Sequence, residues 1–323
     1  MISQVITVSP RGFCAGVARS INVVEDCLDI FGAPVYVKHA IVHNKTVVND
    51  LEKKGAITVE EVSEIPEGAI AVFSAHGSPP EHYDEARTRG VKIIDATCPL
   101  VTKVHIEIVR YIKDGYKVIY VGHKGHVEGI GVLGEAKKLG IEVPLVDTID
   151  DVQELAYPKD AKIVILTQTT LSIDETALII EAIKMKYPNT TEPAASDICF
   201  ATTNRQGAIK FLAHKVDLAL VVGSVTSSNS NRLVEVARNE GIEAYLIDCV
   251  DEINESWLQG KAVVGLSAGA SAPEYRVQEI VNFFVEKGAK ASQYDPIHEN
   301  MTFTEPAELT KAKAENTKER IQD

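Results

Sequence analysis

Three cysteine-bearing stretches decide how this chain folds: Arg11-Gly12-Phe13-Cys14-Ala15-Gly16, Asp95-Ala96-Thr97-Cys98-Pro99 and Ser196-Asp197-Ile198-Cys199-Phe200-Ala201-Thr202-Thr203. In each of them, a predicted strand gives way to a predicted helix at the cysteine. The cysteines divide the 323 residues into near-thirds, which predicts three repeats that converge on one centre. Because a helix N-terminus favours negative charge, the three thiols are biased toward thiolate, the form that binds metals.

Outside these stretches, short β-branched runs alternate with segments of helical periodicity. This alternation predicts an α/β chain with mainly parallel sheets, organised as three similar α/β domains over residues 1–97, 98–196 and 197–323. The runs are Val5 to Val8, Val35 to Val37, Ile70 to Phe73, Lys117 to Val121, Ile163 to Leu166, Leu218 to Val222 and Val263 to Leu266. From about residue 305 the chain is charged and poor in apolar residues, so we expect a tail that lies on the surface or is partly disordered.

The composition is that of a soluble globular protein, with 45% hydrophobic and 24% charged residues. No apolar run reaches the roughly 18 residues of a membrane span, and no signal segment opens the sequence. Five cysteines, an odd number, fit a reducing compartment. We therefore expect a cytoplasmic protein without a membrane partner. The net charge of −13 argues against a nucleic-acid partner but not against a local basic patch.

Six polar loops follow the predicted strands. In open α/β sheets ligands bind beyond the carboxyl ends of the strands, so these loops are candidate walls of one pocket. Hydroxyls, amides and imidazoles dominate them, and backbone amides at helix N-termini can hold phosphate without cationic side chains. The loops are His43-Asn44, Ser74 to Ser78, Gly122 to Glu128, Thr167 to Thr170, Ser227 to Asn231 and Ser267 to Ser271.

The isolated cysteines favour an iron–sulfur cluster over zinc. Zinc is the first metal to test, but structural zinc usually takes paired ligands at C-x2-4-C spacing, which this chain lacks. A cubane cluster normally takes four cysteines, and three would leave one iron open for substrate. Cys27 lies about 20 Å along the helix from Cys14 at the usual rise, and Cys249 has no helix start after it. Both are therefore expected to be packing residues.

Three histidines and one glutamate in the polar loops are candidates for the chemistry. Singly, His43, His76 and His126 are explained as turn residues bonded to backbone. Jointly, at the same end of the sheets as the cysteines, they favour a site. Glu128 either delivers protons with a raised pKa or is a first-turn glutamate placed by the helix dipole.

A glycine run keeps other functions open. Gly129-Ile130-Gly131-Val132-Leu133-Gly134 matches the G-x-G-x-x-G dinucleotide pattern. In a dinucleotide site the first glycine follows the strand directly, whereas residues 122–128 intervene here. The alternatives are a nicotinamide- or flavin-dependent reductase that uses this loop, and a non-enzymatic sensor that binds a cluster or an anion without turnover.

Taken together, the motifs resemble those of the 4-hydroxy-3-methylbut-2-enyl diphosphate reductases (the IspH/LytB family), which catalyse the last step of the non-mevalonate (MEP/DOXP) isoprenoid pathway. The matches occur in the family's order from about residue 5 to residue 280. They are Arg11 to Val17, Ala75-His76-Gly77, Asp95 to Pro99, Gly125 to Glu128, Thr167 to Thr170, Cys199 with Ala201 to Gln206, Ser227 to Arg232 and Ala268 to Pro273.

The resemblance implies a reaction and a cofactor. It implies a [4Fe–4S] cluster, one per chain, held by Cys14, Cys98 and Cys199 at the centre of the three domains. The reaction it implies is two-electron reductive dehydroxylation of (E)-4-hydroxy-3-methylbut-2-enyl diphosphate to isopentenyl and dimethylallyl diphosphate. An external donor such as ferredoxin or flavodoxin would supply the electrons.

The resemblance also assigns roles to the polar residues. Glu128 would be the catalytic residue that helps supply the proton with which the hydroxyl leaves as water, and His126 and Thr169 would surround the same end of the substrate. The diphosphate would be bound by His43, His76, Ser227, Ser228, Asn229 and Ser271.

Overall fold

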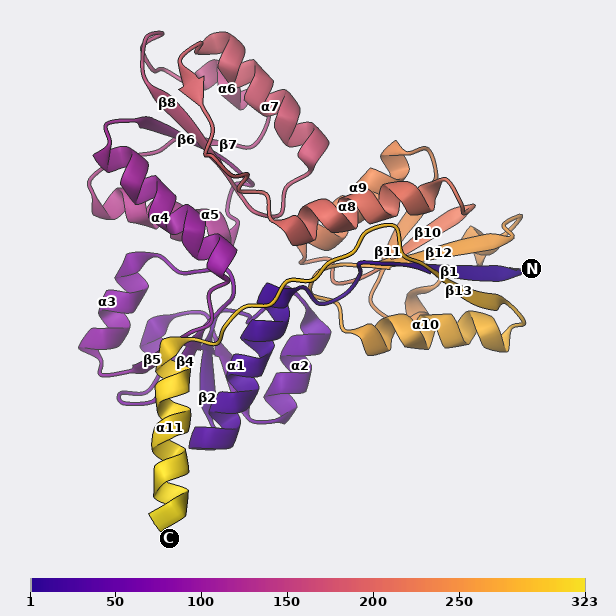
Figure 1. Cartoon of the computed structure of the whole chain (residues 1–323), viewed down its shortest axis with the longest axis horizontal. Coiled ribbons are helices and arrows are strands. Elements are labelled where there is room, and N and C mark those ends of the chain that lie inside the picture. Colours follow the sequence, from indigo (N-terminus) through magenta and orange to yellow (C-terminus); the bar gives the residue numbers. More distant parts are fainter. Residues whose placement is uncertain (1, 323) are drawn as a thin grey trace. The chain divides into compact units, whose positions relative to one another are not determined.

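Strands and helices alternate along the computed structural model, which describes residues 2–322 and, in the last helix, side chains up to residue 317 (Figure 1). The strands are β1 (Gln4–Val8), β2 (Val35–Lys38), β3 (Ala56–Val59), β4 (Ile70–Phe73), β5 (Lys92–Asp95), β6 (Lys117–Val121), β7 (Leu145–Val146), β8 (Ile163–Thr167), β9 (Thr190–Thr191), β10 (Leu218–Val222), β11 (Glu243–Ile247), β12 (Val263–Ala268) and β13 (Lys290–Tyr294). The helices are α1 (Ala15–Phe31), α2 (Lys45–Lys53), α3 (Pro80–Thr88), α4 (Pro99–Lys113), α5 (Val127–Lys138), α6 (Asp151–Glu154), α7 (Ile173–Lys186), α8 (Phe200–Ala213), α9 (Ser228–Asn239), α10 (Glu274–Glu286) and α11 (Ala307–Gln322), with 3-10 turns η1 (Val62–Glu64), η2 (Val250–Glu252) and η3 (Glu255–Leu258).

The chain folds into two compact units. The first unit comprises the residues up to 17, 43–47 and 200–302, and the second comprises 18–42, 48–199 and the residues from 303 on. The first unit contains one five-stranded sheet, and the second contains two four-stranded sheets. All strand pairings in the described part of the chain are parallel.

The sheet of the first unit has the strand order β11-β10-β12-β1-β13. Successive side chains of a strand point to opposite faces of the sheet, and the side chains of β10 are buried on both faces. Leu218, Leu220 and Val222 belong to the core with α10, while Ala219 and Val221 belong to the core with α8 and α9. Figure 1 shows α8 and α9 on one side of this sheet and α10 on the other. Burial on both faces explains why the strand is apolar throughout.

The first sheet of the second unit has the order β3-β2-β4-β5. Ala71 and Phe73 of its central strand β4 pack with Val62 of η1 and Ala86 of α3. The second sheet, β7-β6-β8-β9, is again covered on both faces. Along β6, alternate side chains pack with α4 and α5 or with α6 and α7. α5 contacts both α3 and α4, so helices join the two sheets within this unit.

The predicted fold class is confirmed, because the chain is α/β with three parallel sheets. One strand departs from the consecutive division into 1–97, 98–196 and 197–323: β1 pairs with β12 and β13. No helix of the described residues combines the length and apolarity that crossing a bilayer requires.

The expectation of a partly disordered C-terminal tail is wrong for the described residues. They form α11, whose Leu309 is fully buried. Lys313 pairs with Asp26 of α1 at 2.8 Å, and the Asn316 side chain donates to the Ile30 carbonyl at 3.1 Å. One buried leucine and these polar contacts are enough to dock a helix that is otherwise charged.

Candidate active site

The predicted site residues occur in both units. Cys14, His43, Ser227, Ser228, Asn229 and Ser271 lie in the first unit. His76, Cys98, His126, Glu128, Thr169 and Cys199 lie in the second.

Cys14 lies in the loop between β1 and α1. Its backbone N–H donates to the Ala270 carbonyl at 3.1 Å, and its Sγ accepts from the Val17 N–H at 3.5 Å. The sulfur therefore lies at the N-terminus of α1. Gly12 is required two residues earlier, because its φ is +65° and a Cβ there would come within 3.2 Å of the Ala272 carbonyl. The buried guanidinium of Arg205 donates to the Gly12 carbonyl at 2.8 Å and holds this loop.

Asn229 and Ser271 each form a hydrogen bond with the backbone of a loop that follows a strand. Asn229 is buried, and its Oδ1 accepts from the Ala270 N–H at 2.8 Å. Its Nδ2 is also buried and has no hydrogen-bond partner among the described residues. Ser271 donates its hydroxyl to the His43 carbonyl at 3.2 Å. Since a buried donor without a partner is costly, the Asn229 amide points to a bound acceptor.

Ser227 and Ser228 mark the start of α9. Ser227 is the N-cap, and its hydroxyl accepts from the Ser230 N–H at 3.2 Å. Ser228 opens the helix, where the helix dipole favours an anion. Hydroxyls, an amide and a helix N-terminus thus occur in the first unit.

Asn44 is a candidate that the sequence analysis did not select. It is almost fully buried, and its Oδ1 accepts from the Val47 N–H at 3.1 Å near the start of α2. Its Nδ2 is buried without a partner among the described residues, as in Asn229. The available signal was its position: an asparagine of a polar loop, next to His43 and directly before a helix.

In the second unit, Cys98 is the N-cap residue of α4, with Pro99 in the first turn. The Cys98 N–H donates to the Ala75 carbonyl at 3.0 Å, which places the cysteine loop beside the loop of His76. Gly77 has φ +75°, and a Cβ there would meet the His105 ring at 2.6 Å. Only glycine lets the chain turn at this point.

His76 and His126 lie next to each other in this unit. Their ring centroids are 6.5 Å apart in an edge-to-face arrangement. His126 is the N-cap of α5, and its Nδ1 accepts from the Glu128 N–H at 3.2 Å. This bond leaves the proton of the neutral imidazole on Nε2. His126 is therefore positioned by a local backbone contact, and its proximity to His76 comes from the tertiary fold.

Glu128 is held by Thr169. Its carboxylate accepts from the Thr169 backbone N–H at 2.7 Å and from the Thr169 hydroxyl at 2.8 Å. Burial raises the pKa of Glu128 to about 7, although the two Thr169 bonds act to lower it and the Asp197 charge adds to the increase. At neutral pH the group can both release and accept a proton, which is what a general acid needs.

Cys199 is connected to the same residues. Its backbone N–H donates to the Thr169 carbonyl at 3.0 Å, and α8 begins at the next residue. Asp197 fixes the loop before it, because its carboxylate binds the Lys103 ammonium at 2.7 Å and the Thr167 N–H at 3.0 Å. The structure thus links Cys98, His76, His126, Glu128, Thr169 and Cys199 through successive contacts within one unit.

The other two cysteines differ from these three. Cys27 is fully buried, and burial raises the pKa of its thiol to about 12. Cys249 follows β11 and precedes only the short turn η2. Cys14, Cys98 and Cys199 are partly exposed and stand at helix starts. The described residues of the chain contain no ready-made group of three or more His, Cys, Asp and Glu side chains for a metal ion, but these three thiols have the chemistry and exposure that an iron–sulfur group requires.

The glycine run does not form a dinucleotide loop. Gly129, Gly131 and Gly134 lie inside α5, where each allows close packing. A Cβ at Gly131 would come within 3.2 Å of His105, and one at Gly134 within 2.6 Å of Pro79. The pattern therefore reflects how α5 packs against its neighbours within the second unit.

The fold and the site define an α/β enzyme whose thiols, imidazoles and buried acid follow the carboxyl ends of parallel strands. The family model described as LytB protein matches residues 5–285. The chain belongs to the LytB family. Membership in that family implies an iron–sulfur cofactor.

Similar proteins cover nearly the whole chain. The 4-hydroxy-3-methylbut-2-enyl diphosphate reductase of Nitrosomonas europaea is 48% identical over 93% of this chain and 93% of its own length. The 4-hydroxy-3-methylbut-2-enyl diphosphate reductase of Histophilus somni is 49% identical over 95% of this chain and 98% of its own length. A solved structure of the Plasmodium falciparum E-1-hydroxy-2-methyl-but-2-enyl-4-diphosphate reductase matches with a TM-score of 0.95 and 38% identity, over 98% of this chain and 100% of that one. A solved (E)-4-hydroxy-3-methyl-but-2-enyl diphosphate reductase, the terminal enzyme of the non-mevalonate pathway, matches with a TM-score of 0.65 and 31% identity, over 88% and 100%.

Proposed function

We propose that this protein is an iron–sulfur reductase that converts (E)-4-hydroxy-3-methylbut-2-enyl diphosphate to isopentenyl and dimethylallyl diphosphate. The reaction consumes two electrons and two protons, breaks the carbon–oxygen bond of the hydroxyl and releases water. The relatives named above are named as reductases of 4-hydroxy-3-methylbut-2-enyl diphosphate. Within this chain, the observation that carries the proposal is the buried Glu128 carboxyl bound to Thr169.

Cys14, Cys98 and Cys199 are the proposed ligands of one [4Fe–4S] cluster per chain. Their exposure supports this choice over the buried Cys27, and their places at helix starts support it over Cys249. When bound, such a group passes electrons one at a time and offers a Lewis-acidic iron. An external one-electron donor such as ferredoxin or flavodoxin supplies the electrons, and the enzyme works in the cytoplasm.

The diphosphate is the proposed ligand of the neutral donors. The buried Asn229 amide, the hydroxyls of Ser227, Ser228 and Ser271 and the start of α9 supply hydrogen bonds without a cationic side chain. His43 and His76 complete the set. Hydrogen bonds to a charged acceptor are each worth about 1.5–3 kcal/mol, so several of them can hold an anion.

Glu128 is the proposed source of the proton that leaves with the hydroxyl. With a pKa of about 7 it is partly protonated at neutral pH. Its bond to the Thr169 hydroxyl offers a path by which Glu128 gives a proton to Thr169 while Thr169 passes its own to the substrate oxygen. His126, with its proton on Nε2, is a further donor toward the same end of the substrate.

The proposal is tested by turnover in anaerobically purified protein, with reduced viologen dye and the hydroxylated diphosphate as substrate. We expect both five-carbon diphosphate products and one water per two electrons. Arg110→Met, which changes an exposed residue, is the matched control that should keep parental activity. A brown, iron-containing protein that binds the substrate but releases no product would contradict the proposal and favour a sensor.

A further inference from the structure

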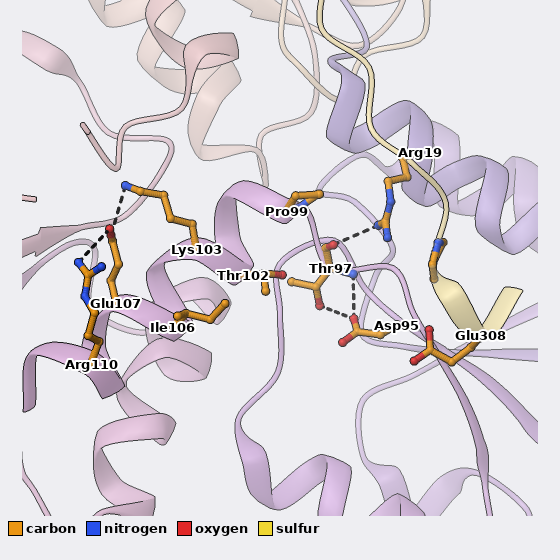
Figure 2. A pocket seen from close by; sticks show the side chains of 11 residues that line it. Arg19, Asp95, Thr97, Pro99, Thr102, Lys103, Ile106, Glu107, Arg110 and Glu308 are labelled. Atoms are coloured by element: carbon orange, nitrogen blue, oxygen red, sulfur yellow. Dashed lines mark hydrogen bonds and ion pairs between the residues drawn. The ribbon is translucent and has the colours of Figure 1, made fainter. Parts of the chain in front are cut away.

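Arg19 of α1 reaches the loop that carries Cys98. Its Nη1 donates to the carbonyls of Ala96 at 3.2 Å and Thr97 at 3.1 Å. The Thr97 carbonyl belongs to the peptide bond that joins Thr97 to Cys98. Figure 2 shows the Arg19 guanidinium directed at Thr97, on the wall of a cavity of about 540 Å³ that Pro99 also lines. A positive charge therefore lies beside the backbone of a proposed ligand.

The segment before α11 also forms a hydrogen bond with this guanidinium. Arg19 Nε donates to the Thr304 carbonyl at 2.6 Å, just before α11 begins. Leu309 and the pairing of Lys313 with Asp26 anchor α11 in the same unit. The guanidinium is thus bound to two backbone segments, and these hydrogen bonds fix the position of its charge.

The Cys98 loop does not depend on Arg19 alone. The Ser20 hydroxyl donates to the Ala96 carbonyl at 2.9 Å, and the Ala96 N–H donates to Phe73 at 2.9 Å. The Cys98 N–H is bound by Ala75. These bonds remain when the Arg19 side chain is replaced, so the charge can be removed while the loop stays in place.

Arg19 stays charged in this environment. Burial lowers its pKa, while the negative charges of Cys98, Asp95 and Glu308 act to raise it. A guanidinium does not lose its proton in proteins. Because the charge is partly buried, salt screens it less than an exposed charge.

We propose that Arg19 is a positioning residue that raises the reduction potential of the iron–sulfur group by holding a fixed positive charge beside Cys98. The inference rests on the proposed role of Cys98 as a ligand. Reduction adds one negative charge to the group, and a nearby positive charge stabilises the more negative state. The charge therefore makes the first electron easier to accept.

The test compares Arg19→Met, which removes the charge and keeps the length, with Arg19→Lys, which keeps the charge. Arg110→Met is the matched control, because it removes an exposed cation from the wall of the same cavity without touching residues 96–98. Each anaerobically purified protein is assayed for iron and sulfide and then titrated with a reductant, without substrate, while the electron paramagnetic resonance signal is followed.

We expect all variants to contain iron, and Arg19→Met to have a roughly tenfold lower equilibrium constant for reduction, a shift of about 59 mV to more negative potential. Arg19→Lys and Arg110→Met should keep the parental potential. A parental potential in Arg19→Met, or an equal shift in Arg19→Lys, overturns the inference. If Arg19→Met binds no iron, Arg19→Lys decides: the parental potential supports the role of charge and a shifted one refutes it.

A failure of the proposed function would give a different result from a failure of this inference. A parent that has a measurable potential but no turnover refutes the reductase activity and leaves the comparison of potentials intact. A parent without any iron–sulfur signal refutes both.

Discussion

Thr169 donates both its backbone N–H and its hydroxyl to the Glu128 carboxylate, at 2.7 and 2.8 Å. Glu128 lies in the first turn of α5, which follows β6, and Thr169 lies in the loop after β8. The two strands are neighbours, because β6 pairs with β8. The same Thr169 accepts the Cys199 N–H through its carbonyl. One threonine therefore fixes the position of the buried acid relative to a proposed cluster ligand.

We expect Glu128→Gln to bind substrate and cluster normally and to turn over at least about a hundredfold more slowly, because a positioned acid is worth about 10²–10⁴ in rate. The measurement is the single-turnover rate of water loss under saturating reductant. Glu135→Gln, on the same helix but paired with His105, is the matched control and should keep the parental rate. Equal rates in Glu128→Gln and the parent would show that the proton has another source.

Glu128 should also make stability depend on pH. Its pKa rises from 4.5 to about 7 on folding, so the folded state binds the proton more tightly than the unfolded state. The contribution of Glu128 to the free energy of unfolding therefore falls as pH rises from about 4.5 to 7. At about 1.4 kcal/mol per pKa unit, the loss approaches about 3 kcal/mol.

This dependence is measured by urea unfolding of the parent and Glu128→Gln at several pH values between 4.5 and 8.5. The stability of the glutamine variant relative to the parent should increase with pH and level off above about 8. A difference that is the same at every pH would mean that Glu128 does not titrate in this range.

Cys98→Ser should lose most of the bound iron and sulfide, because a proposed thiolate ligand is removed. Cys27→Ala should keep both, since Cys27 is fully buried and its thiol pKa is raised to about 12. Metal and sulfide analysis of the two anaerobically prepared variants makes the comparison. Full iron content and activity in Cys98→Ser would end the three-ligand proposal.

Asn229→Ala should weaken substrate binding by about 1–3 kcal/mol, the cost of losing a hydrogen bond to a charged group. The visible absorption of the cluster should be unchanged. Asn239→Ala, an exposed asparagine at the other end of α9, is the control and should bind like the parent. Calorimetric titration with the substrate compares the three proteins, and equal affinities would place the diphosphate elsewhere.

Leu309→Ala should lower the free energy of unfolding by about 2–4 kcal/mol, because Leu309 is fully buried where α11 docks. Lys311→Ala changes an exposed residue of the same helix and should have an effect within about 0.5 kcal/mol. Urea unfolding measures both variants. A Leu309→Ala variant as stable as the parent would mean that α11 is not docked in solution.

Much of the fold could be predicted because parallel strands buried on both faces are apolar throughout. The runs around Leu218 and Ile163 are of this kind, and both form central strands. For the tail from residue 305, the helix and its docking were not predicted, because one buried leucine among charged residues leaves almost no pattern. The glycines of α5 matched a dinucleotide motif, which the intervening residues 122–128 already argued against. Their packing partners, such as Pro79 and His105, could not be predicted because they are distant in sequence.

The sequence by itself determined the alternation of strands and helices, the three cysteines at helix starts and the polar loops at strand ends, because these depend on local periodicity and spacing. Only the tertiary structure decided that β1 pairs with β12 and β13 and that the Asn229 side-chain amide is buried without a hydrogen-bond partner among the described residues. It also decided that Glu128 is buried and hydrogen-bonded to Thr169, with a pKa of about 7. Each of these depends on residues far apart in the chain, because strand pairing and the removal of water from a side chain are set by whatever the fold brings next to it.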